Sequence, residues 1–218
     1  RTINSDSGKT ISQPINTSGN LSMNFYGGTG FKIKKIDMRV NFNPHFSYIK
    51  NAEVINGKQS FAKTFLPGID FGVSKSKEKK YDFDIRNGIS YNTNTTSQNS
   101  TTIHYITNTV NVDATIYIKK VWSVISDYQF DYRQKTQQIT TALNTHILNA
   151  RLQRTFKKDE FTAYFTVRDI LNQNVGVQRN FNSNTYTEVI NDRLKRYFLV
   201  GFTWDFKNKS SVKPPVTN

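Results

Sequence analysis

Aspartates and arginines that alternate with apolar residues are the side chains of this sequence with the most chemistry to offer. They recur at even spacing, as in the run from Asp82 through Asp84 to Arg86. Residues two apart lie on one face of a β-strand, where carboxylates and guanidinium groups of neighbouring strands can form ion pairs. The sequence therefore predicts a polar wall, with a substrate or ion path as its alternative use. The candidates for this wall are Arg39, Asp70, Asp82, Asp84, Arg86, Asp113, Asp127, Asp131, Arg133 and Arg151.

Catalytic and metal-binding residues show no comparable pattern. His45, His104 and His146 fall in separate segments, without the i, i+2 or His-Glu-X-X-His spacing that gathers metal ligands. The chain has no cysteine, which excludes disulfides, thiolate chemistry and cysteine-based metal sites. Ser90 and Ser126 lie outside any Ser-His-Asp motif, and no glycine-rich phosphate loop is present. We therefore expect no enzyme activity, no metal and no cofactor.

The net charge of +14 would suggest nucleic acid as a partner if the protein were soluble. The basic residues, however, gather at apparent strand ends and turns, with no helix or aromatic–basic motif to present them to a groove. The clusters are Lys32, Lys34 and Lys35; Lys75, Lys77, Lys79 and Lys80; Lys119 and Lys120; Lys157 and Lys158; and Lys195 and Arg196. We expect no nucleic-acid partner. Lysines at a membrane rim would instead contact anionic lipid headgroups, at about 1 kcal/mol each.

Period-two alternation recurs about every twenty residues from Gly19 to Phe206, and no sustained helical period is present. No segment approaches the roughly 18 to 20 consecutive apolar residues of a membrane helix. The mean hydropathy of −0.61 agrees with a membrane β-barrel, whose strands alternate between lipid and a polar lumen. We predict an all-β fold, an antiparallel transmembrane β-barrel with about nine to ten strands in this chain. The polar wall would then face the lumen.

The connections between these segments alternate in length. Short turns are predicted near 27–30, 74–80, 119–120 and 157–160, and longer polar loops near 50–61, 92–102, 134–140 and 172–193. Short periplasmic turns and long extracellular loops are typical of outer-membrane barrels, as are aromatic girdles at strand ends. The residues expected in the girdles or facing the membrane are Phe46, Tyr48, Trp122, Phe130, Phe202, Trp204 and Phe206. A soluble sandwich predicts neither feature, and in a sandwich Pro44 would mark an edge strand or a bulge.

Several segments resemble one family. The run Val167–Asn174, the pair Arg179-Asn180, Tyr186 and the stretch Arg196–Phe206 resemble the carboxyl end of Bacteroidetes outer-membrane β-barrel proteins of the TonB-dependent receptor type. The resemblance is best over roughly residues 103–206 and looser back to Gln13–Asn16. It implies a barrel of about 22 strands, filled by an amino-terminal plug, that takes up a scarce nutrient with energy from an inner-membrane partner. The implied partners are outer-membrane lipid and lipopolysaccharide, the remaining strands and plug, and the TonB system or a surface lipoprotein.

We expect residues 1–206 to form a barrel segment and residues 207–218 a disordered tail. Counting back from Phe206 as a periplasmic end places residues 1–18 at an extracellular loop, and closed single-chain barrels normally have an even number of strands. The chain is therefore expected to be the carboxyl-terminal portion of a larger barrel, with substrate capture by loops 51–60, 92–102 and 172–192. The alternatives are a structural or accessory outer-membrane barrel in a surface complex and a soluble β-sandwich binding module, for example for carbohydrate.

Overall fold

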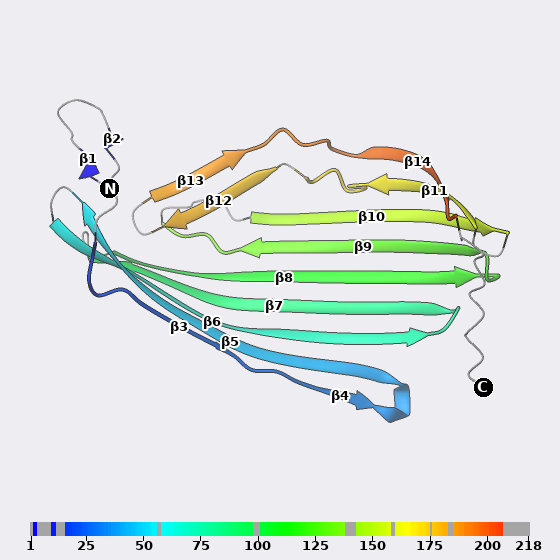
Figure 1. Ribbon diagram of the computed structural model, residues 1–218, viewed down its shortest axis with the longest axis horizontal. Coiled ribbons are helices and arrows are strands. Elements are labelled where there is room, and N and C mark those ends of the chain that lie inside the picture. Colours follow the sequence, from blue (N-terminus) through cyan, green and yellow to red (C-terminus); the bar gives the residue numbers. More distant parts are fainter. Residues whose placement is uncertain are drawn as a thin grey trace, which may run out of the picture.

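The main body of the protein is one open antiparallel β-sheet of ten strands (Figure 1). The computed structural model describes residues 2–3, 10–11, 16–55, 58–97, 101–137, 143–157, 160–174, 176–182 and 185–206. The strands follow the order β14-β11-β10-β9-β8-β7-β6-β5-β3, and β4 also pairs with β5. The predicted all-β antiparallel class is confirmed, whereas the described sheet does not close into a ring.

The strands are short at the edges of this sheet and long in its middle. The main-sheet strands are β3 (Leu21–Tyr26), β4 (Thr29–Ile33), β5 (Met38–Ile55), β6 (Lys58–Lys77), β7 (Tyr81–Thr96), β8 (Thr101–Ile118), β9 (Trp122–Arg133), β10 (Leu143–Phe156), β11 (Phe161–Arg168) and β14 (Tyr197–Trp204). Two separate hairpins pair β1 (Thr2–Ile3) with β2 (Thr10–Ile11) and β12 (Val177–Asn182) with β13 (Thr185–Ile190). A 3-10 turn, η1, spans Lys34–Ile36. No helix in the described ranges is long and apolar enough to cross a membrane.

The turn predicted at residues 27–30 is wrong, because Gly27 and Gly28 interrupt a strand and do not reverse it. Strands β3 and β4 pair with β5 in one continuous register, with Tyr26 opposite His45 and Thr29 opposite Phe42. At the interruption the Gly27 amide donates to the Pro44 carbonyl oxygen at 2.9 Å. Pro44 has no amide hydrogen to give back, so the ladder breaks opposite it. The chain reverses later, at η1.

The long loops predicted at 50–61 and 92–102 are also wrong over most of their length. Strand pairing continues through them, so that Ile55 lies opposite Lys58 and Thr96 opposite Thr101. Asparagine and threonine are frequent in segment 92–102, and side chains there bond across strands. For example, Thr64 Oγ1 donates to Asn94 Oδ1 at 2.8 Å. Threonine is a good strand former, so a polar composition did not mean a loop here.

The remaining predicted connections agree better with the structure. The turns predicted at 74–80, 119–120 and 157–160 fall where β6, β8 and β10 end. Residues 134–137 leave the sheet after β9, and the connection predicted at 172–193 contains the β12–β13 hairpin. The tail predicted at 207–218 lies outside the described residues.

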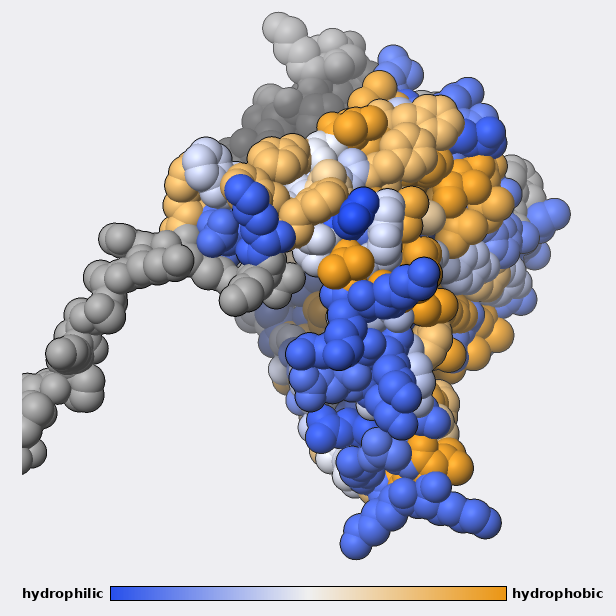
Figure 2. Space-filling view, turned by 90° about the vertical axis from the view of Figure 1, so that its right-hand side faces the viewer, coloured by the Kyte–Doolittle hydropathy of each residue, from blue (hydrophilic) through white to orange (hydrophobic). Residues whose placement is uncertain are grey.

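The strand registers sort the side chains into two faces. Residues directly opposite each other share a face, and apolar residues meet apolar residues from one edge to the other, as in Phe42 with Phe71 and Phe165 with Val200. We term this side the apolar face; its exposed large residues are Leu21, Met23, Phe25, Phe31, Phe42, Phe65, Phe71, Phe83, Ile85, Ile89, Tyr91, Ile116, Ile118, Leu152, Phe165, Phe198, Val200, Phe202 and Trp204. Figure 2, viewed from the end of the sheet with the short turns, shows apolar side chains gathered along one side of the molecule and polar ones along the other.

The sheet has almost no core of its own. The buried apolar residues of the described ranges are Val40, Ala62, Ile103 and Tyr105. By contrast, the exposed large residues of the apolar face named above are 39% to 85% exposed. Hydrophobic burial, the dominant favourable term in folding, is therefore largely unrealised within this chain, and the apolar face requires a non-aqueous neighbour.

Candidate functional site

The charged candidates predicted from the sequence all share the side of the sheet opposite the apolar face, which we term the polar face. Two hollows of about 460 and 530 Å³ open on this side, so the sheet is concave there. The first is lined by residues that include Arg39, Asp82 and Asp113, and the second by residues that include His45 and Asp70. The register brings the candidates of β5 to β10 onto one continuous surface.

Three aspartates form a row across the middle of the polar face. Asp84 lies directly opposite Asp113, and Asp113 lies opposite Asp127 on the next strand. Like charges at directly opposite positions destabilise a sheet, so this row needs compensation. Arg86 provides part of it, because its Nε lies 2.6 Å from Asp84 Oδ1 and its Nη2 lies 2.5 Å from Asp113 Oδ2.

The third carboxylate of the row is held by partners from the opposite direction. Asn149 Nδ2 donates to Asp127 Oδ2 at 2.5 Å, and Arg168 Nη1 lies 3.8 Å from Asp127 Oδ1. Sequence reasoning did not include Arg168 or Asn149 among the candidates. The row therefore spans β7 to β9. Arg86 links β7 to β8, and Asp127 links β9 to Asn149 on β10 and to Arg168 on β11.

The other carboxylates of the polar face are paired mainly with neutral groups. Asp82 accepts hydrogen bonds from Ser76 Oγ and, at 2.9 Å, from Tyr117 Oη. Asp131 accepts from Thr109 Oγ1 at 3.1 Å and from Gln129 Nε2 at 2.6 Å. On β6, Asp70 Oδ2 lies 3.4 Å from His45 Nδ1. Such contacts fix the carboxylate orientations without neutralising their charge.

Two of the predicted arginines stack on tyrosines. The guanidinium carbon of Arg151 lies 4.5 Å from the ring centroid of Tyr164, and Arg151 Nε donates to Thr166 Oγ1 at 3.0 Å. The Arg133 guanidinium carbon lies 4.3 Å from the Tyr105 centroid. Among the candidates, Arg86 forms the predicted arginine–carboxylate pairs, with Asp84 and Asp113. Stacking on an aromatic ring was missed because the strand register that creates it is not readable from one sequence.

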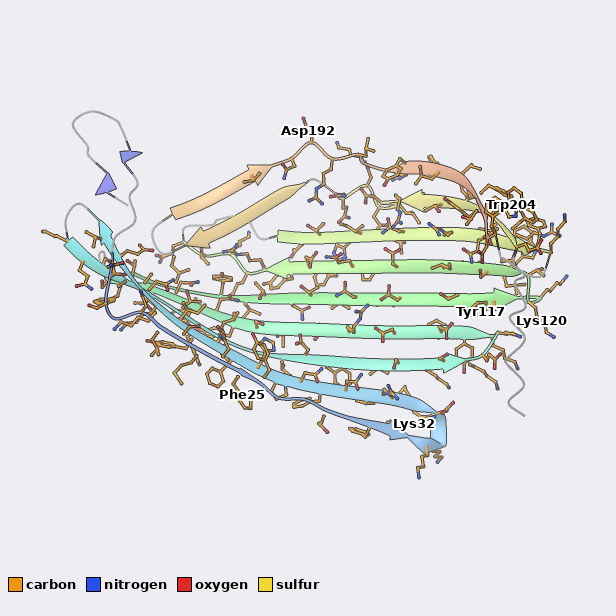
Figure 3. The ribbon with its side chains drawn as sticks, in the orientation of Figure 1. Phe25, Lys32, Tyr117, Lys120, Asp192 and Trp204 are labelled. Atoms are coloured by element: carbon orange, nitrogen blue, oxygen red, sulfur yellow. The ribbon has the colours of Figure 1, made fainter. Side chains whose placement is uncertain are left out.

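The residues predicted to face the membrane lie on the apolar face or directly beyond it. Phe46, Tyr48, Trp122, Phe130, Phe202 and Trp204 share that face through the strand registers. Phe206 follows β14, and its ring centroid lies 3.9 Å from that of Trp204. Trp204 and Lys120 lie at the end of the sheet with the short turns (Figure 3). Farther toward the other end, Phe130 stacks on His146 at 4.6 Å.

A buried aspartate after β11 was missed by sequence reasoning. Asp169 is 2% exposed and has a left-handed backbone, with φ of 50°. Its Oδ1 accepts the Gln173 amide at 2.9 Å, and its Oδ2 accepts the Asn174 amide at 3.0 Å. Its own amide donates to Asn149 Oδ1 at 2.8 Å. The carboxylate therefore closes a tight turn in the run that carries the family resemblance.

The same turn is tied to two further strands. Gln173 Oε1 accepts the His146 amide of β10 at 3.0 Å, and Asn172 Oδ1 accepts the Arg196 amide just before β14 at 3.2 Å. The sequence signal for this role is an aspartate at a strand end followed by two amide side chains. The hydrogen bonds of this turn connect the end of β11 to β10 and to the residue before β14.

Catalytic and metal-binding chemistry has no assembled site among the described residues. No group of three or more histidine, aspartate or glutamate side chains there is arranged to hold a metal ion. Ser90 lies on the polar face and Ser126 on the apolar face, so the register separates them. Ser126 Oγ donates to the Asn149 carbonyl oxygen at 3.1 Å.

The fold and the site define a class: an all-β protein whose open antiparallel sheet has one charged face and one exposed apolar face. No family model, no curated protein and no solved structure matches the chain.

Proposed function

We propose that this chain is part of an outer-membrane β-barrel, in which the apolar face contacts lipid and the polar face lines the interior. The observation that carries the proposal is the exposure of the apolar face across the whole width of the main sheet. Soluble monomers rarely expose contiguous apolar patches larger than a few hundred Å². A soluble sandwich would cover such a face with a second sheet. The hairpins outside the main sheet have strands of only two or six residues, too short for that purpose.

The width of the apolar band supports a membrane environment. On β6 the register places Lys63 and Lys75 on the apolar face, at either end of the segment from Phe65 to Val73. The nine residues of that segment extend about 30 Å at about 3.3 Å per residue. At the roughly 40° tilt of membrane barrels this corresponds to about 23 Å, close to their apolar band of about 25 Å.

The open edges support a larger barrel. Nine strands follow one another along the sheet from β14 to β3, and each is antiparallel to the next, so the two outermost strands run in the same direction. Joining these edges would create a parallel pair. Copies of the chain inserted in the same orientation would also meet as parallel pairs. An all-antiparallel ring therefore needs an odd number of additional strands between the two edges.

Strand β14 has the composition of a strand that is normally paired. Its sequence from Tyr197 to Trp204 contains no charged residue and no proline. Charged residues and proline usually protect a free strand edge from unwanted pairing. Its residues Phe198, Val200 and Phe202 are 63%, 85% and 62% exposed, more than the apolar residues of the central strands. These side chains have neighbours on one side only, and an added strand would supply the other side.

The most specific form of the proposal is the carboxyl-terminal portion of a TonB-dependent nutrient transporter. It rests on the resemblance at Val167–Asn174 and Arg196–Phe206, and the contacts of Asp169 give that motif a structural role. In such a transporter the charged polar face would meet the plug, and substrate capture would fall to the ends of β5 to β8 and to the β12–β13 hairpin. These segments correspond to the loops expected from the sequence.

Flotation with lipid vesicles tests the membrane part of the proposal. The chain is refolded from urea with preformed vesicles, washed at alkaline pH and centrifuged through a density gradient. The expected result is that it floats with the lipid and stays bound after the wash. A folded, monomeric chain in detergent-free buffer would contradict the proposal, since its apolar face would then be stable in water.

The gene tests the transporter part. We expect the coding sequence upstream of Arg1 to encode further barrel strands, a plug and a segment that contacts TonB. Barrel strands without a plug or a TonB-contacting segment would contradict the transporter and favour an accessory barrel.

A further inference from the structure

The short turns carry lysine where the backbone favours glycine. Lys79, Lys119, Lys120 and Lys157 have φ values of 54°, 51°, 62° and 48°, in the left-handed region. This region is sterically unfavourable for residues with a Cβ and is normally occupied by glycine, asparagine or aspartate. Lys119 and Lys120 are consecutive, as in the hairpin turn that prefers Asn-Gly. The four positions belong to three successive turns, β6–β7, β8–β9 and β10–β11.

Other cations at the same end are placed over aromatic rings. On the apolar face, the Arg154 guanidinium carbon lies 5.2 Å from the Trp122 ring centroid and 4.7 Å from that of Phe156. Lys75 Nζ lies 5.9 Å from the Tyr81 centroid. In the β10–β11 turn, Lys157 Nζ lies 5.2 Å from the Phe161 centroid. We term Lys75, Lys79, Lys119, Lys120, Arg154 and Lys157 the basic rim.

Acidic residues at this end do not offset the basic rim. Glu78 Oε1 lies 3.8 Å from Lys79 Nζ, with both side chains largely exposed. Asp37 pairs with Lys32, at 2.5 Å between Oδ1 and Nζ, and lies next to Lys34 and Lys35 in the β4–β5 connection. Glu160 and Asp205 also lie at this end. The described lysines and arginines there still outnumber the acidic residues, so the end of the sheet with the short turns remains cationic.

We propose that the basic rim binds the phosphate groups of anionic phospholipids in the leaflet that meets the short turns. This inference rests on the proposed membrane location. A lipid partner fits better than an acidic protein because the cations are spread along the sheet end, one turn after another, and continue the apolar face. Lys75 lies opposite Phe83 and Arg154 opposite Trp122, so the register places both on the apolar side, where lipid would lie. Lysine contacts phosphate as a point charge, whereas arginine can form two hydrogen bonds with it.

The left-handed backbone provides a variant that removes charge without disturbing the fold. The substitutions Lys79→Asn, Lys119→Asn, Lys120→Gly and Lys157→Asn introduce residues that suit positive φ, so the turns should form at least as well. The matched control removes the same charge from exposed positions away from the short turns. These are Lys58→Asn, Lys135→Asn, Arg193→Gln and Lys195→Asn.

The test measures partition of each chain into vesicles of phosphatidylcholine alone and into vesicles that also contain phosphatidylglycerol. We expect the anionic lipid to strengthen partition of the original chain by about tenfold. The rim variant should lose most of that gain, and the control should keep it. Equal partition of the original chain into both vesicles, or an equal loss in the control, would overturn the lipid assignment. Failure of the original chain to bind either vesicle would instead contradict the proposed function.

Discussion

The two faces of the sheet are built from the same strands, yet one carries large apolar side chains and the other carries charged ones. On the apolar face, large hydrophobic side chains remain exposed over the whole width of the sheet. On the polar face, aspartates lie opposite one another and are compensated by specific partners such as Arg86. A soluble protein would bury the first face and expose the second. Under the proposed function, the polar face meets water or polar protein and the apolar face meets lipid.

A charge in the middle of the apolar face should have the largest effect. Leu148 lies on the apolar face opposite Tyr128, and the adjacent Ile147 lies on the polar face opposite Gln129. We expect Leu148→Arg to destabilise the chain in lipid by about 2 to 4 kcal/mol, the cost of arginine near the bilayer midplane. The measurement is urea unfolding of the chain bound to vesicles.

Ile147→Arg is the matched control for that substitution. It introduces the same side chain in place of an isomer of leucine, one residue away on the same strand. We expect a change of less than about 1 kcal/mol, because lumen positions tolerate charge. Equal destabilisation by the two arginines would mean that the faces do not differ in environment.

Removing the Asp169 carboxylate should have the next largest effect. Asp169→Ala leaves the amides of Gln173 and Asn174 without their acceptor, and we expect a loss of about 2 kcal/mol. Asp169→Asn keeps one acceptor and suits the left-handed backbone, so its loss should be about half as large. The stability loss of each variant should be the same in detergent and in lipid, because the turn lies beyond the end of strand β11 and its hydrogen bonds are local. A loss seen only in lipid would argue against a local role for the turn.

The row of aspartates predicts a smaller, coupled effect. Arg86→Gln should destabilise the chain by about 0.5 to 1 kcal/mol, because Asp84 and Asp113 then face each other uncompensated. Adding Asp113→Asn should restore part of this loss, since it removes one of the like charges. A double-mutant cycle with denaturant unfolding measures the coupling. Strictly additive losses would mean that Arg86 does not compensate the row.

The smallest effect is expected from pH at the β4–β5 turn. The hydrogen bond and charge of Lys32, together with the charges of Lys75 and Lys77, lower the pKa of Asp37. A lowered pKa in the folded state means that the ionised form stabilises the fold. This contribution is present above the unfolded pKa of about 3.9 and is lost as pH falls through the lower folded value.

The substitution Asp37→Asn should therefore weaken the pH dependence of stability at about pH 4 and below, where the original chain loses this contribution. The measurement is the unfolding midpoint of both chains at neutral and acidic pH. Identical pH profiles would show that the Asp37–Lys32 contact contributes nothing to stability.

The sequence allowed the faces to be predicted, because side-chain alternation is a local property of each strand. The faces of the candidate residues, including Arg39 and Trp122, agree with the register. The strand ends were not predictable in the same way, since threonine and asparagine are common both in loops and in polar strand ends. The glycines at 27–30 signalled a turn, but the cause of the interruption is Pro44, which is distant in sequence.

The contacts within the site were less predictable than its location. Pairing of Arg86 with Asp113 depends on the register between β7 and β8, and alternation within each strand does not specify that register. The role of Asp169 depends on hydrogen bonds to backbone amides four and five residues later. The aspartate and the amide side chains that follow it indicate a turn, but they do not specify these bonds. The left-handed lysines also have no sequence signature, because lysine is unusual at such positions.

The reactivity of single cysteines introduced at neighbouring positions on the two faces tests the central claim most directly. The chain has no cysteine of its own, so single substitutions can be placed at Leu152 and Val112 on the apolar face and at Gln153 and Asn111 on the polar face. The chain in vesicles is then treated with a water-soluble maleimide. We predict that cysteines at Gln153 and Asn111 react several times faster than those at Leu152 and Val112. Equal rates, or faster reaction on the apolar face, would contradict a lipid-facing apolar side.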